Sequence, residues 1–257
     1  MGSMRLRVAL VSAVVALAAP ATASADRYVA LGDSFSSGVG TGSYTLSSSC
    51  RRSVYAYPSL LAQQRPNTSL AFVACSGATT GDVLATQVQA VTPDTNIVTM
   101  TVGGNDIGFA DLIVQCTLGS CSTALDNTRA SLRTVLAPRL DGAYTTVRSR
   151  ALGASVVVLG YPLIFSSASC FGTLGISATE RAKANELADA LDQLTAERAA
   201  AAGLRYVSSV AAFTGHAVCA GGAWLNGLNL FSTVESYHPN RSGHSLGYLP
   251  LVRAAVG

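Results

Sequence analysis

Short apolar runs alternate with longer amphipathic stretches along this chain. Each short run is apolar or β-branched and is bounded by glycine or polar residues, which is the pattern of a strand. The expected strands are 28–31, 70–74, 97–102, 155–159 and 205–210. The expected helices are about 54–64, 80–90, 122–150, 177–202 and 241–255. Strands that alternate with helices predict an α/β fold, a three-layer α/β/α sandwich with a central, mostly parallel five-stranded sheet.

The first 25 residues have a different pattern, which is typical of a secretory signal peptide. Arg5 and Arg7 form a basic start, an apolar run follows over 8–19, and small residues offer cleavage after Ala23 or Ala25. The apolar run is short for a bilayer span, although an N-terminal membrane anchor is the alternative. The remainder, 26–257, has no internal repeat or low-complexity linker and is expected to form one secreted domain.

The charge balance argues against several partners. The chain has 17 Lys+Arg and 14 Asp+Glu, and removal of Arg5 and Arg7 leaves 15 basic against 14 acidic residues, a net charge of +1. Such a chain lacks the excess of basic residues with which proteins bind nucleic acid or an anionic membrane. We expect no nucleic-acid partner, no transmembrane segment after the signal peptide, and a monomer.

Six cysteines follow the signal peptide, and an even number in an exported chain argues for disulfides. The sequence leaves the connectivity open. The simplest pairing is sequential: Cys50–Cys75, Cys116–Cys121 and Cys170–Cys219. Zinc is the competing interpretation, but the chain has no Cys-x-x-Cys pair and no histidine at ligand spacing. We therefore expect no metal and no cofactor.

Polar and glycine residues follow three of the expected strands. The first is followed by Gly32-Asp33-Ser34, the second by Cys75-Ser76-Gly77, and the third by Gly103-Gly104-Asn105-Asp106. Ligands in parallel sheets bind at the carboxyl ends of the strands, so these loops should share one rim. A serine, a glycine amide and an asparagine are the parts of an acyl-transfer site, a nucleophile with oxyanion donors. Taken alone, each of the three segments also has the composition of an ordinary turn without a catalytic role.

A serine nucleophile needs a base, and the chain has three histidines. His238 directly precedes a proline, which favours extended backbone on a loop before the last helix. We interpret His216 and His244 as surface or capping residues and His238 as the base. The segment GHSLG, 243–247, matches a nucleophile elbow, but it follows no strand and no Asp, Glu or His comes after it. Ser245 is therefore not the expected nucleophile.

The blocks GDSFSSG, CSGATTGDV, GGNDIGF and ESYHPN resemble, in order and spacing, those of the GDSL or SGNH hydrolases. The likeness spans about 27–255 and is greatest to secreted Streptomyces-type lipases and esterases, which carry three disulfides. Phe35 stands where the family name has leucine. The resemblance implies that Ser34 attacks an ester, that His238 is the base, and that Ser34 N–H, Gly77 N–H and the Asn105 amide hold the oxyanion.

The same resemblance leaves the group that orients His238 open between two candidates. Many members have an Asp where this chain has Glu235, whereas related actinomycete enzymes use a backbone carbonyl, here that of Ser236. We favour the Ser236 carbonyl. The resemblance implies fatty-acyl ester substrates, including triacylglycerols, phospholipids and esters at lipid–water interfaces. A carbohydrate O-deacetylase and a non-catalytic secreted binding protein are the alternatives.

Overall fold

The computed structural model describes residues 1–2 and 25–257, and the predicted signal peptide falls almost entirely outside these residues. Five strands form one sheet: β1 (Asp26–Gly32), β2 (Thr68–Phe72), β3 (Ile97–Thr101), β4 (Ser155–Leu159) and β5 (Arg205–Val207). Their order is β2-β1-β3-β4-β5, and every neighbouring pair is parallel. The predicted fold class is confirmed, with a sheet that is wholly rather than mostly parallel.

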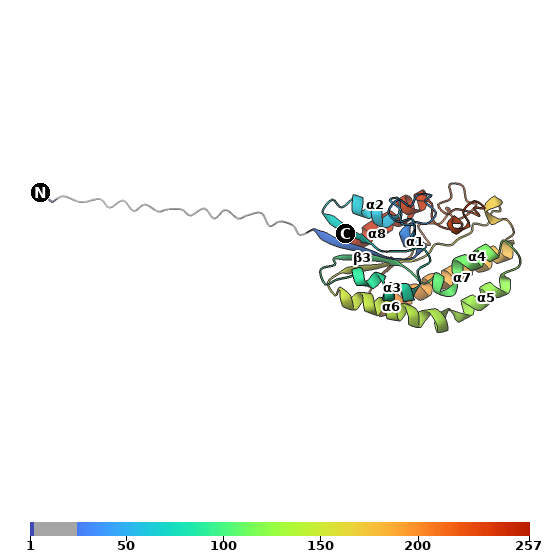
Figure 1. The fold of residues 1–257 in the computed structure, drawn as a ribbon, viewed down its shortest axis with the longest axis horizontal. Helices are drawn as coiled ribbons and strands as arrows, with labels where there is room; N and C mark the ends of the chain where they lie inside the picture. Colours follow the sequence, from blue (N-terminus) through green and yellow to red (C-terminus); the bar gives the residue numbers. More distant parts are fainter. Residues whose placement is uncertain (3–24) are drawn as a thin grey trace.

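Helices cover both faces of this sheet (Figure 1). One layer contains α1 (Ser34–Ser37), α2 (Tyr57–Gln63) and α8 (Leu249–Val256). The other layer contains α3 (Thr80–Ala85), α4 (Phe109–Gln115), α5 (Ser122–Ser131), α6 (Ala137–Arg150) and α7 (Ala178–Ala201). No helix in the described part of the chain is both long and apolar enough to cross a bilayer.

The hydrophobic pattern explains which strands occupy the centre. Every residue of β3 is buried, and β1 is buried from Tyr28 to Gly32, because helices cover both faces. The edge strands β2 and β5 remain partly exposed. The longest helix, α7, begins with a capping box, in which Ser177 and Glu180 satisfy each other's backbone N–H groups. Gly203, with φ +68°, follows its end.

Several elements differ from the sequence-based expectation. The predicted helix 122–150 contains a π-helical turn, Leu132–Leu136, between α5 and α6, and the last helix contains another, Gly243–Tyr248, before α8. Helix α4 was not predicted. His244 is not a surface residue, because it is completely buried within the second π-helical turn. Its Nδ1 accepts the Tyr57 N–H at 3.3 Å.

The strand order places the candidate residues at a topological switch point. The chain passes from β1 to β2 on one side and from β3 to β4 on the other, so the connections diverge between β1 and β3. Ligands bind outside the carboxyl ends of parallel strands at such a point. Ser34 follows β1, and Asn105 begins a 3₁₀ turn (Asn105–Ile107) shortly after β3.

Candidate active site

The first strand ends in a tight turn that carries Ser34. Gly32 has φ +115°, and a Cβ at this position would lie 2.3 Å from the carbonyl oxygen of Thr101, so the turn requires glycine. Asp33 caps α1 by accepting the Phe35 N–H at 2.9 Å. Ser34 is thus the first helical residue, and its backbone N–H has no acceptor within the helix.

His238 lies against Ser34, although 204 residues separate them. Its Nε2 is 2.8 Å from Ser34 Oγ, and its Nδ1 is 2.9 Å from the carbonyl oxygen of Ser236. Because a carbonyl oxygen can only accept, Nδ1 carries the proton and Nε2 can accept the hydroxyl proton of Ser34. Burial lowers the pKa of His238 to about 4, so the imidazole is neutral at pH 7. A neutral imidazole is the form that a general base requires.

The backbone next to His238 explains why the Ser236 carbonyl reaches its ring. Tyr237 has φ +62°, a left-handed conformation that is uncommon for an aromatic residue. The Tyr237 N–H donates to the carbonyl of Asn226 at 3.0 Å, and the Asn226 N–H donates to the carbonyl of His238 at 2.9 Å. This pairing holds the strained residue in place. No sequence signal indicated Asn226, which lies in an uncharged loop without a recognisable motif.

The carboxylate of Glu235 makes a different hydrogen bond. Its Oε1 accepts from the hydroxyl of Tyr44. Burial, followed by this hydrogen bond, raises the pKa of Tyr44 to about 12, so the phenol is the donor. Glu235 lines a separate hollow with Gly40 and Phe231, whereas the pocket at Ser34 is lined by other residues. The structure therefore brings the Ser236 carbonyl, and not the Glu235 carboxylate, to His238.

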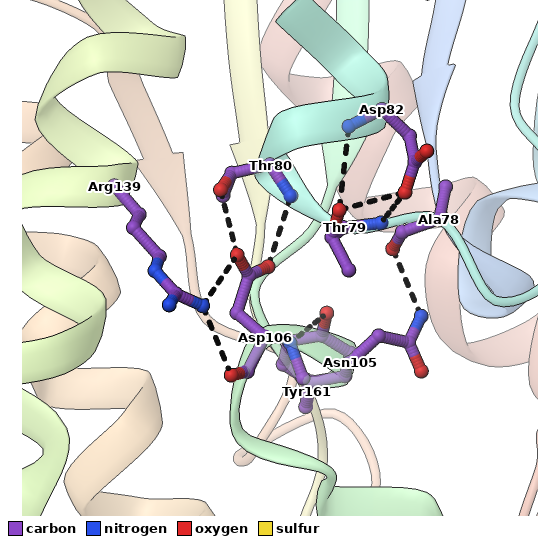
Figure 2. Close-up of polar contacts among 9 residues, drawn as sticks. Ala78, Thr79, Thr80, Asp82, Asn105, Asp106, Arg139 and Tyr161 are labelled. Carbon is purple, nitrogen blue, oxygen red and sulfur yellow. Dashed lines mark hydrogen bonds and ion pairs between the residues drawn. The ribbon is translucent and has the colours of Figure 1, made fainter.

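Gly77 and Asn105 line the same pocket as Ser34 and His238, a cavity of about 590 Å³. Gly77 has φ +83°, a conformation that glycine adopts without strain. One N–H of the Asn105 side chain donates to the carbonyl of Ala78 at 2.9 Å (Figure 2). An amide has two N–H groups, so this bond orients the side chain and leaves the second N–H for a ligand.

A buried aspartate joins the two loops that carry Gly77 and Asn105. The Asp106 side chain is only 1% exposed and accepts the backbone N–H of Thr80 at 2.9 Å and its hydroxyl at 2.7 Å (Figure 2). Arg139 lies 3.6 Å from the same carboxylate. The loop after β2 and the loop after β3 are thereby fixed to each other. From the sequence alone, Asp106 had no role beyond its place in the turn after β3.

A second buried acid, Asp33, lies in the turn directly before Ser34. Tyr161 donates its hydroxyl to Asp33 Oδ2 at 2.5 Å and accepts the Gly104 N–H at 3.0 Å. Burial raises the pKa of Asp33 to about 7, and the Tyr161 hydrogen bond opposes that rise. Tyr161 therefore connects the Ser34 turn to the residue before Asn105. It follows β4 in an apolar segment, and only its position after a strand could have indicated it.

Phe35 stands where the family name has leucine, and its side chain packs between Tyr161 and His238. Its ring meets that of Tyr161 edge to face, with centroids 4.9 Å apart, and lies 5.1 Å from the His238 ring. An aromatic side chain at this position thus supports the imidazole.

The cysteines form three disulfides, Cys50–Cys75, Cys116–Cys121 and Cys170–Cys219. The first holds the loop before Gly77, where the Ser76 N–H also donates to the carbonyl of Cys50 at 3.0 Å. Among the described residues, no group of three or more His, Cys, Asp or Glu could hold a metal ion. Ser245 lies in a π-helical turn rather than at the end of a strand. His216 is half-buried and stacks on Trp224.

The fold and this site together define a class: α/β/α proteins with a serine–histidine pair at the carboxyl ends of β1 and β3. A model of the GDSL-like Lipase/Acylhydrolase family matches residues 30–246. The chain is 44% identical over 253 residues to "Lipase" from Streptomyces rimosus, covering 96% of this chain and 93% of that protein. It is 43% identical, with the same coverage, to "Lipase 1" from Streptomyces coelicolor.

Two solved structures agree with this assignment. The extracellular lipase of Streptomyces rimosus superposes with a TM-score of 0.85 at 44% identity, covering 90% of this chain and all of that one. Phospholipase A1 from Streptomyces albidoflavus superposes with a TM-score of 0.86 at 44% identity, covering 90% of this chain and 99% of that one. The protein belongs to the GDSL-like lipase/acylhydrolase family.

Proposed function

We propose that this protein is a secreted serine ester hydrolase that cleaves fatty-acyl esters of lipids. The observation that carries the proposal is the 2.8 Å contact between Ser34 Oγ and a buried, neutral His238 at the carboxyl ends of the sheet. The relatives named lipase and phospholipase A1 support acyl glycerol and phospholipid substrates. Secretion, with cleavage after Ala23 or Ala25, and a monomeric state are part of the proposal.

The proposed reaction uses Ser34 as the nucleophile. As Ser34 Oγ attacks the ester carbonyl carbon, His238 Nε2 accepts its proton, and the carbonyl of Ser236 stabilises the resulting imidazolium. The oxyanion receives hydrogen bonds from the Ser34 N–H, the Gly77 N–H and the free N–H of Asn105. His238 then returns the proton to the leaving alcohol.

The second half of the reaction removes the acyl group. Water attacks the acyl-enzyme carbonyl, His238 accepts a proton from this water, and Ser34 leaves as the restored hydroxyl when it regains that proton. Ala110, Val114 and Val234 line the pocket beside these groups and provide apolar surface for an acyl chain. The remaining lining is polar and includes Ser76, Thr79, Asp111, Gln115 and Thr233, so the preference for fatty-acyl esters rests on the relatives named lipase and phospholipase A1.

Labelling with a fluorophosphonate followed by peptide mapping tests the nucleophile. We expect the label on Ser34, and Ser34→Ala should abolish both labelling and ester hydrolysis. Ser245→Ala should leave both near the parent level. Labelling at Ser245, or no labelling of the folded protein, would contradict the assignment; the second result would favour a binding protein.

A hydrolysis profile tests the substrate class. We expect p-nitrophenyl esters of medium and long acyl chains, triacylglycerol and phosphatidylcholine to be cleaved. Faster cleavage of acetylated oligosaccharides than of any fatty-acyl ester would favour the deacetylase alternative.

A further inference from the structure

Three loops at one end of the molecule expose large apolar side chains. Leu118 lies between α4 and α5, Phe171 and Leu174 lie in a 3₁₀ turn and its cap before α7, and Leu230 and Phe231 lie in the long segment after β5. Phe231 is fully exposed, and the exposed fraction of Leu118 is 87%. We call these five side chains the apolar rim.

The loops that carry the apolar rim contact one another. A Cβ on Gly175 would lie 2.3 Å from the carbonyl oxygen of Thr117, so the first two loops touch. The Leu228 N–H donates to the carbonyl oxygen of Gly172 at 3.1 Å, which joins the second loop to the third. In Figure 1, this part of the chain gathers around the end where α4 lies. The three loops are therefore neighbours, and Phe171, Leu230 and Phe231 line one hollow among them.

Disulfides hold two of these loops in shape. Cys116 and Cys121 close a small ring around Leu118, and the Cys170–Cys219 bridge anchors the residue next to Phe171. These bridges restrict the backbone that carries Leu118 and Phe171. Large exposed apolar patches on soluble proteins mark interaction sites.

The chain segments that carry the apolar rim are poor in ionised side chains. The segments 112–125, 151–179 and 206–234 contain no Asp, Glu, Lys or Arg. A hollow of about 460 Å³ lies among Phe171, Leu230 and Phe231, and its lining contains a single ionisable residue, Glu235. Such a surface complements an uncharged or zwitterionic partner and gives no attraction to an anionic one.

The apolar rim is continuous with the candidate active site. Val114 and Gln115, which directly precede the Leu118 loop, line the pocket at Ser34. Thr233 and Val234, which follow Phe231 closely, line its other side. A partner seated on the rim would therefore lie at the mouth of this pocket.

We propose that the apolar rim docks the protein on an electrically neutral lipid surface, with Leu230 and Phe231 inserted among the acyl chains. The inference rests on the proposed function, because the lipid at the mouth of the pocket would then be the substrate. Each inserted side chain contributes by removal of its apolar surface from water.

Vesicle partition of the Ser34→Ala protein tests the docking surface without hydrolysis. The probe is a vesicle of ether-linked phosphatidylcholine, which carries no cleavable ester. The Leu230→Ser/Phe231→Ser pair should lower the partition coefficient roughly tenfold or more, because two apolar side chains lose their insertion. Leu118→Ser should lower it by a smaller factor. Higher ionic strength should leave it nearly unchanged, because no charges take part.

The matched control is Leu152→Ser. Leu152 is 72% exposed but lies between α6 and β4, at the amino end of the strands and away from the pocket. Equal partition of the Leu230/Phe231 pair and the Leu152 control would overturn the proposal. Partition that requires anionic lipid would also overturn it. A third contrary result would be a rim variant that loses self-association but still binds vesicles like the parent.

Hydrolysis of a soluble short-chain ester separates this inference from the proposed function. With Ser34 present, the Leu230→Ser/Phe231→Ser variant should cleave the soluble ester at nearly the parent rate. A parent that cleaves the ester but does not bind vesicles refutes the docking surface alone. A parent that binds vesicles but cleaves no ester refutes the proposed function alone.

Discussion

Replacing Glu235 by glutamine distinguishes the two ways in which His238 can be oriented. In the structure, Nδ1 of His238 lies 2.9 Å from the Ser236 carbonyl oxygen, while the Glu235 carboxylate accepts from Tyr44. Nδ1 carries one proton, and that proton is already directed to the carbonyl. Glu235→Gln should therefore leave the imidazole in its orientation and tautomer.

The expected magnitudes follow from these contacts. Glutamine keeps a carbonyl oxygen that can accept from Tyr44, so the exchange weakens a charge-assisted hydrogen bond to a neutral one. Such a change at a half-exposed position should cost about 1 kcal/mol or less in unfolding free energy. Turnover should fall by about tenfold or less. If Glu235 were a triad member, the loss should approach the ten-thousandfold known for the serine-protease aspartate.

Turnover of a soluble short-chain ester is the appropriate assay, with a thermal melt to verify folding. Tyr44→Phe is the matched control, because it removes the same hydrogen bond from the other side and leaves the carboxylate in place. Under the Ser236 arrangement, the two variants should lose similar, small fractions of activity. A loss above about a thousandfold in well-folded Glu235→Gln, with Tyr44→Phe near the parent, would refute the reasoning and restore a triad.

Four further outcomes can be measured on the same protein. Asn105→Ala should lower turnover by roughly a hundred- to a thousandfold with little change in KM, as measured by steady-state kinetics; a loss below about tenfold would make it only a turn residue. Tyr161→Phe should lower the melting temperature and raise the Asp33 pKa further above its usual range, which carboxyl NMR titration can follow. Because His238 must be neutral to act, kcat/KM should rise with pH through about 4 rather than 6.5. Reduction of Cys170–Cys219, the longest of the three loops, should destabilise the fold by about 2–4 kcal/mol in a denaturant titration, and free thiols in the native protein would contradict it.

The pH dependence of stability has two opposing parts. The folded pKa of His238 lies below that of a free histidine, so its contribution is present above about pH 6.5 and is lost as the pH falls to about 4. The folded pKa of Asp33 lies above that of a free aspartate, so its contribution is present at acid pH and is lost as the pH rises to about 7. Across pH 4 to 7 these two contributions oppose each other, and His244, whose pKa burial lowers to about 3, acts in the same direction as His238.

The sequence predicted the elements whose signals are local. Strands β1, β3 and β4 are continuous apolar runs ended by glycine or polar residues, so both their existence and the rim they share could be read directly. Helix α7 carries its own start and stop signals in Ser177 and Gly203. The residues that follow these strands already indicated Ser34, Gly77 and Asn105 as parts of an acyl-transfer site, and the family motifs assigned the same roles residue by residue.

The features that the sequence did not predict depend on contacts between distant residues or on backbone geometry. Helix α4 has only seven residues, too few for a helical period to stand out from the apolar run. The two π-helical turns insert a residue without changing the composition that indicates a helix. His244 was interpreted as a surface or capping residue. It does accept the N–H of Tyr57 at the start of α2, but it is buried there, and that burial depends on a helix far away in the chain.

The choice between Glu235 and Ser236 illustrates the same limit at the site. A carboxylate three residues before a histidine suggests a triad, whereas a backbone carbonyl leaves no mark in a sequence. What brings the Ser236 carbonyl to the ring is the positive φ of Tyr237, a conformation that is common for glycine and rare for tyrosine. The partner that holds it, Asn226, lies in a segment with no motif.

The polar network in Figure 2 gives a physical reason for the burial of Asp106 beside the candidate oxyanion donors. A buried carboxylate is costly unless it is well bonded, and this one accepts both the N–H and the hydroxyl of Thr80. Those bonds fix the loop of Gly77 to the loop of Asn105 before any substrate arrives. Donors that need no rearrangement stabilise a developing negative charge more effectively than mobile ones. An oxyanion site built from Gly77 and Asn105 needs the loops after β2 and β3 to be held at a fixed separation. The buried Asp106 carboxylate provides that connection, which is consistent with its place beside the candidate donors.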